Sequence, residues 1–101
     1  MLGNPNLDDC YTGLTENQIR LIYPGTKVEA RLKLDPVYSH VVVYAPSDEQ
    51  GKPKDYVAVE PALNANNGFN LLARGWEGSG VHVLEPGEEW GGFCELSWSE
   101  F

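Results

Sequence analysis

Residues 27–34 have the sequence Lys-Val-Glu-Ala-Arg-Leu-Lys-Leu, in which charged and apolar side chains alternate at every position. Successive side chains of a β-strand point to opposite faces, so the four apolar residues would share one face. These are Val28, Ala30, Leu32 and Leu34. The pattern predicts a half-buried strand, with Glu29 and the basic residues facing solvent.

The next segment, Tyr38–Ala45, is rich in β-branched and aromatic residues and contains the run Val41–Val43. A continuous apolar run of this length is typical of a strand that is buried on both faces. We therefore expect this strand near the centre of a sheet.

Further strands are predicted where short apolar segments end at Pro, Gly or Asn. They are Gln18–Tyr23, Asp55–Glu60, Gly80–Leu84 and Gly92–Trp98. Turns are expected at Pro24-Gly25, Ser47–Lys54 and Pro86-Gly87, and an ordered loop at Asn64–Asn70. No segment has an apolar stripe of helical period, so the prediction is an all-β, antiparallel β-sandwich formed by residues 1–101 as a single domain or a fragment.

The charge of the chain argues against polyanionic partners. It contains 15 acidic and 7 basic residues, and the basic ones are scattered. This balance disfavours nucleic acid and anionic membranes and suits a neutral small molecule. Met1–Asn6 lacks the features of a signal peptide, and no apolar run could span a bilayer, so we expect a soluble, cytoplasmic protein.

The two cysteines, Cys10 and Cys94, have no metal-binding spacing and are expected to be reduced thiols, although a disulfide between them is an open alternative. No metal or other cofactor is predicted.

Glu60 is the most informative candidate for chemistry. It ends the segment Asp55–Glu60, in which Tyr56, Ala58 and Glu60 would share one face, and Pro61 holds it in an extended backbone. Partial burial beside Tyr56 would suit a general base. The alternative is an exposed glutamate at the end of a strand.

Asp8 and Asp9 precede Tyr11 in a polar segment. Their carboxylates could accept hydrogen bonds from sugar hydroxyls, bind calcium, or lie in a solvated turn, and two carboxylates alone are too few for a calcium site. His40 and His82 lie in predicted strands, where a structural role is the usual one.

The aromatic residues have two interpretations. The tryptophans and tyrosines could stack on a sugar ring, or they could belong to the core and the sheet faces. The tryptophans are Trp76, Trp90 and Trp98.

Four segments, in order along the chain, resemble the aldose 1-epimerase (galactose mutarotase-like) family. They are Leu7–Leu14, which carries an Asp-containing motif; Val41–Pro46, a strand that ends in an aromatic residue; Tyr56–Pro61 followed by Gly68–Asn70, a glutamate-bearing strand; and Val83–Glu88, a closing hairpin.

The resemblance implies a large antiparallel β-supersandwich, of which this chain matches the last third or so. It implies that Glu60 is the general base and that Asp8 is a ligand to sugar hydroxyls, with Asp9 in that role if the register differs by one residue. Tyr44 is implied as a substrate contact. The acid of the family is a histidine upstream of the matching region, and neither His40 nor His82 occupies such a position.

Three hypotheses follow. The chain is a truncated or split aldose 1-epimerase that acts on a free aldose, a non-catalytic sugar-binding module, or a structural β-protein. Cutting a supersandwich would leave strand edges and apolar faces uncovered, so we expect a homo-oligomer or pairing with a complementary N-terminal chain.

Overall fold

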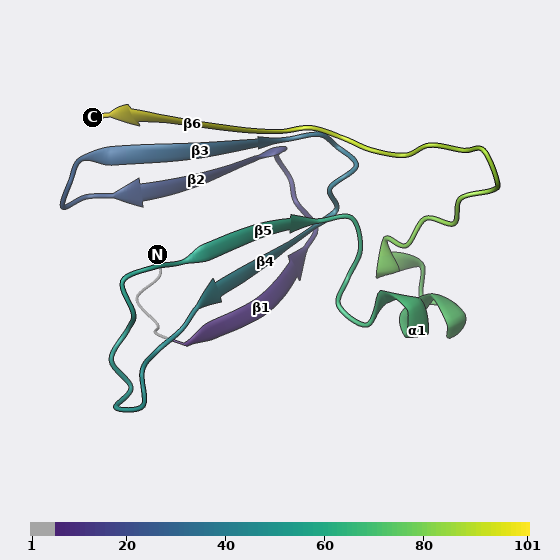
Figure 1. Cartoon of the computed structure of the whole chain (residues 1–101), viewed down its shortest axis with the longest axis horizontal. Helices are drawn as coiled ribbons and strands as arrows, with labels where there is room; N and C mark the ends of the chain where they lie inside the picture. Colours follow the sequence, from purple (N-terminus) through teal and green to yellow (C-terminus); the bar gives the residue numbers. More distant parts are fainter. Residues whose placement is uncertain (1–5) are drawn as a thin grey trace.

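The chain forms two antiparallel sheets, each of three strands. The computed structural model describes residues 6–101. Most of Met1–Asn6, the segment expected not to be a signal peptide, lies outside this range. The strand orders are β1-β4-β5 and β2-β3-β6 (Figure 1). The strands are β1 (Leu7–Thr12), β2 (Gln18–Tyr23), β3 (Val28–Leu34), β4 (His40–Ala45), β5 (Ala58–Ala62) and β6 (Cys94–Glu100). The all-β prediction is confirmed, and the arrangement is compatible with a β-sandwich.

The β4 strand occupies the centre of its sheet, as its apolar run predicts. Its burial is lower than expected: Val41 is buried, but Val42 and Val43 are only half-buried and Tyr44 is exposed. The expectation of burial on both faces was therefore wrong, because the described residues cover the faces of this sheet only in part.

The second sheet follows the alternation of residues 27–34. Register pairs Leu32 with Ile19 and Leu96, and Ala30 with Leu21 and Trp98, so one face is apolar. Its other face carries the charged residues. They were predicted to face solvent, but one of them is buried.

That residue is Glu29, which is 7% exposed. Arg20 Nε donates to Glu29 Oε1 at 2.6 Å, and Arg31 Nε donates to Oε2 at 2.9 Å. The two half-exposed arginines cover the carboxylate and satisfy both of its oxygens, so the burial is compensated.

Three other local predictions were wrong. Leu7–Thr12, where a solvated turn was one interpretation of Asp8 and Asp9, is a full strand because it pairs along its whole length with β4. Gly80–Leu84 is coil, since Gly80 has φ 76° and no described strand pairs with it. The ordered loop predicted at Asn64–Asn70 runs into a helix that was not expected: Gly68–Ala73 forms the six-residue helix α1, followed by the 3-10 turn η1 (Glu77–Ser79).

The buried centre lies where the chain passes from one sheet to the other. Its apolar side chains come from the ends of β3 and β4 and from the loop after β5. They are Leu34, Val41 and Ala65. Here Ser39 Oγ donates to the Leu63 carbonyl at 3.0 Å, and the amide of Ala65 donates to the Ser79 carbonyl at 2.8 Å.

The molecule is extended for its size. Its radius of gyration is 16.1 Å, against about 13 Å for an ordinary domain of this length. Many large apolar side chains are exposed, including Leu96 and Trp98 at 61% and 72%. Among the described helices, none is long and apolar enough to cross a membrane.

Substitution of Gly80 should destabilise the junction between the sheets. A Cβ at this position would lie 2.7 Å from the Leu63 carbonyl oxygen and 2.8 Å from Ser39 Oγ, with φ 76°. Gly80→Ala should therefore lower the free energy of unfolding by about 2–4 kcal/mol, as measured by urea denaturation. The matched control, Gly13→Ala, has φ 72° with nothing within 4 Å and should cost about 1 kcal/mol. Equal losses would contradict this account.

The stability contributed by Glu29 should depend on pH. Hydrogen bonds from Arg20 and then Arg31 lower the pKa of Glu29 below its ordinary value of 4.5. Its contribution is therefore complete above about pH 4.5 and is lost as the pH falls through the lower, folded-state pKa. Chemical denaturation should show Glu29→Gln less stable than the wild type at pH 7, with the difference shrinking towards pH 3. Glu16→Gln, at an exposed loop position, should show no such trend. If the difference in stability between the wild type and Glu29→Gln is as large at pH 3 as at pH 7, the assigned role of Glu29 is wrong.

Candidate functional site

Strand register brings three predicted site residues to one face of the β1-β4-β5 sheet. Asp8 lies directly opposite Tyr44, and Tyr44 lies directly opposite Ala58. Glu60 is two residues beyond Ala58 on β5, so its side chain points to the same face. We call this surface, defined by Asp8, Tyr44 and Glu60, the carboxylate face.

The two carboxylates flank the central strand. Strands lie about 4.8 Å apart and rise about 3.4 Å per residue, which puts the Cα atoms of Asp8 and Glu60 about 12 Å apart with Tyr44 between them. Asp9 is opposite Val43 and points to the other face of the sheet. Of the two neighbouring aspartates, only Asp8 shares a face with Glu60.

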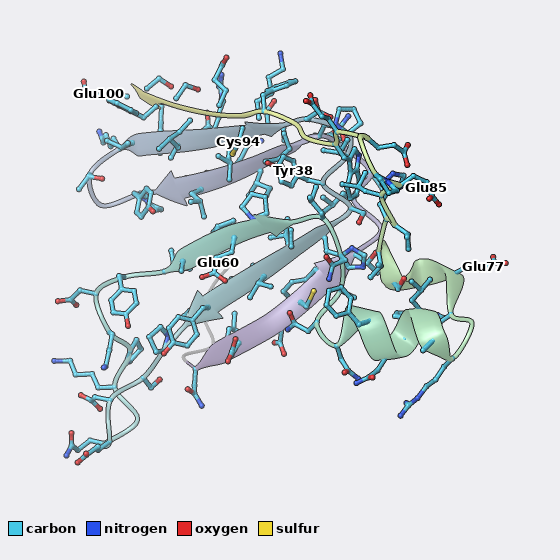
Figure 2. The ribbon with its side chains drawn as sticks, turned by 45° about the vertical axis from the view of Figure 1, so that its right-hand side comes forward. Tyr38, Glu60, Glu77, Glu85, Cys94 and Glu100 are labelled. Carbon is cyan, nitrogen blue, oxygen red and sulfur yellow. The ribbon has the colours of Figure 1, made fainter. Side chains whose placement is uncertain are left out.

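Glu60 occupies the middle of β5 and is exposed. Figure 2 shows its side chain leaving the strand near the middle of the arrow. The expectation that the strand ends at Glu60 was wrong, because it continues through Pro61 to Ala62. Of the two interpretations of this residue, partial burial and exposure, the structure shows exposure. Pro61 is tolerated within the strand because β5 is a sheet edge, where a missing backbone N–H can face solvent.

Tyr44 has an aromatic and an acidic neighbour. Its ring centroid is 6.4 Å from that of Tyr56, with the planes tilted by 52°. The neighbouring Tyr56 hydroxyl, partial desolvation and the Asp8 carboxylate together raise the pKa of Tyr44 above its ordinary value of 10.0. Tyr44 thus remains a neutral phenol that can donate a hydrogen bond and offer its ring for stacking.

Two open hollows adjoin this sheet. One, of about 410 Å³, is lined by Asp48 and residues 52–56, including Tyr56, which contacts Tyr44. The other, of about 560 Å³, begins at Ala62 and is lined mainly by asparagine side chains of the loop before α1. These asparagines are Asn64, Asn66, Asn67 and Asn70.

His40 also belongs to the carboxylate face, because it pairs with Ala62, two residues from Glu60. It is 3% exposed, and its Nδ1 lies 2.7 Å from Ser39 Oγ. Because the Ser39 hydroxyl donates to the Leu63 carbonyl, its oxygen is free to accept from a protonated Nδ1 of His40. Within residues 6–101, no group forms a hydrogen bond with Nε2.

The remaining candidates lie away from the carboxylate face. His82 is in coil after η1, and its ring packs against Trp90 with centroids 4.4 Å apart. The three tryptophans are all at least 36% exposed, so none belongs to the core, and Trp98 lies in the other sheet.

The potential metal ligands are dispersed over residues 6–101. No three side chains of His, Cys, Asp or Glu converge within this range as ligands would. Cys10 and Cys94 are free thiols on different sheets.

Sequence reasoning missed Cys10 and His40 as members of this face. The signal was available in principle: along a strand, residues 8, 10 and 12 share a face. It could be used only if the segment around Asp8 were recognised as a strand, and its two adjacent aspartates indicate a turn instead.

Comparison with known proteins finds no matching family model, no matching curated protein and no matching solved structure.

The pKa of Tyr44 should respond to its two neighbours in a definite order. Tyr56→Phe should lower it most, because the Tyr56 hydroxyl is the largest contributor, and Asp8→Asn should lower it less. The measurement is a pH titration of ¹³Cζ-tyrosine resonances by NMR. Tyr23→Phe, on the other sheet, is the control and should leave Tyr44 unchanged; the reverse order of effects would contradict the geometry.

Proposed function

We propose that this chain is an aldose 1-epimerase-like protein that binds a free aldose, such as glucose or galactose, on the carboxylate face. The observation that carries the proposal is the register that puts Asp8, Tyr44 and Glu60 on one side of a single sheet. The family resemblance assigns roles to these same residues, and the resemblance used no information about register.

Each residue has a distinct role in this proposal. Glu60, an exposed carboxylate on a strand stiffened by Pro61, is the general base that takes the proton of the anomeric hydroxyl. Asp8 accepts hydrogen bonds from ring hydroxyls. Tyr44 presents its ring to the apolar face of the sugar and its hydroxyl to an oxygen.

Mutarotation also requires an acid to protonate the ring oxygen as the ring opens. Closure after rotation of the aldehyde then reverses both proton transfers and gives the other anomer. Among the described residues, His40 is the histidine on the carboxylate face, but at 3% exposure its ring has no direct path to a bound sugar. The proposal therefore assigns the base and the hydroxyl contacts to this chain, and the proton for the ring oxygen comes from water at this exposed site.

A second candidate function is sugar binding without catalysis. The open, exposed setting of Glu60 and the burial of His40 favour it. An exposed carboxylate is well placed to accept hydrogen bonds from hydroxyls, and binding needs no acid.

The deciding experiment is polarimetry of freshly dissolved α-D-glucose and α-D-galactose with the purified chain. If the proposal holds, the chain accelerates the optical change, and Glu60→Gln removes about a hundred- to ten-thousand-fold of the catalysed rate. Glu77→Gln, on η1 and labelled in Figure 2 well away from Glu60, should leave the rate unchanged.

NMR titration of the same sugars separates the two candidates. Shifts at Asp8 and Tyr44 without any acceleration would establish binding alone. If the sugars cause no chemical-shift changes and the chain causes no acceleration, sugars are excluded as ligands. The cytoplasmic location and a complementary N-terminal chain stay predictions.

A further inference from the structure

The outer edge of β6 is a sheet edge to which another strand could pair. β6 is a terminal strand of its sheet, and within residues 6–101 nothing pairs with its outer side. All seven of its residues are exposed. Figure 2 shows β6 along the rim of the sheet between the labelled Cys94 and Glu100. Such an edge presents a row of free backbone donors and acceptors.

The other three sheet edges carry features that discourage pairing. β5 contains Pro61, which lacks an N–H, and β1 carries the adjacent acids Asp8 and Asp9. β2 has Arg20 near its middle. Charges and proline are the usual protection of edge strands. The charges of β6, Glu95 and Glu100, lie towards its ends, and its central residues, Leu96–Ser99, include neither charge nor proline.

The sequence of β6 is complementary to itself in the antiparallel sense. If two copies pair about Ser97, then Ser97 faces Ser97 of the other copy and Leu96 faces Trp98. Glu95 faces Ser99, and Cys94 faces Glu100, so no like charges are opposed. The register also keeps the apolar faces of both sheets on the same side, because paired residues share a face.

The chain exposes more surface than a compact monomer of its mass, and β6 contributes to this exposure. The accessible surface is 7599 Å², about 1,900 Å² more than expected for a folded monomer of this mass. A stable interface buries about 800 Å² per partner. Leu96 and Trp98, which are central to the pairing, are 61% and 72% exposed.

We propose that two copies of this chain associate through antiparallel pairing of their β6 strands about Ser97, which joins two three-stranded sheets into one of six strands. The contact is isologous, since each copy contributes the same strand and the same residues. The net charge of −8 per copy opposes association. Added salt screens this repulsion and should strengthen the dimer.

Disulfide trapping tests the register directly. In a Cys94→Ser background, Ser97→Cys puts two thiols directly opposite each other, with Cα atoms about 5 Å apart, within disulfide range. Mild oxidation should convert most of this variant to a covalent dimer on a non-reducing gel. In the same background, Ser99→Cys puts its thiols about 14 Å apart and should stay monomeric on the gel. Equal trapping of both variants, or trapping of Ser99→Cys alone, would overturn the register.

Sedimentation equilibrium tests the surface without added cysteines. The wild type should sediment as a dimer, more completely at 0.5 M than at 0.05 M NaCl. Trp98→Lys should shift it to monomer, because a lysine on the edge opposes strand addition. Phe69→Lys, which changes an apolar residue that is 79% exposed on α1, should leave the dimer intact. A monomeric wild type, or a dimer that Trp98→Lys does not weaken, would refute the proposal.

Discussion

The place where the chain passes from one sheet to the other is organised around the side chain of Ser39, whose hydroxyl can donate only one hydrogen bond. Ser39 stands at the end of the crossover from β3 to β4, and its hydroxyl donates to the Leu63 carbonyl in the segment after β5. The same oxygen lies 2.7 Å from Nδ1 of His40. Gly80 has no side chain, which leaves room for the Ser39 hydroxyl, since a Cβ there would lie 2.8 Å from its oxygen. This contact joins the start of β4 to the segment that follows β5, beside the few apolar side chains that are buried. It closes the end of the β4–β5 ladder, which positions Glu60 opposite Val42.

How much of the fold the sequence predicts depends on whether a strand's signal is local. β2, β3 and β4 have apolar patterns of their own and were placed closely, and β4 was correctly put at a sheet centre. β1 has no such pattern, and its pairing with β4 outweighs the turn preference of its aspartates. The segment Gly80–Leu84 has the pattern but no neighbouring strand, and a positive φ at Gly80 breaks it. Local propensity is a weak guide wherever pairing decides the outcome.

The candidate site shows the same division. Residue types and motifs singled out Asp8, Tyr44 and Glu60 one at a time, but only register shows that they share a face. A slip of one residue would have placed Asp9 there instead, because side chains alternate. The burial of individual side chains was also not predictable from the sequence. Glu29 was expected in solvent and is covered by two arginines, whereas partial burial and exposure were both open for Glu60, and the structure shows that it is exposed.

The distribution of proline and charge over the strand edges also determines how far assembly can proceed. A head-to-tail contact would leave a fresh β6 edge on every added copy, and the sheet could then grow into a fibre. Pairing of β6 with itself uses both such edges at once and leaves β2, with Arg20, at each rim. The other sheet offers no alternative route, because Pro61 and the paired aspartates lie on its two edges. A chain with this much exposed apolar surface can therefore form a closed, finite particle rather than an open-ended aggregate.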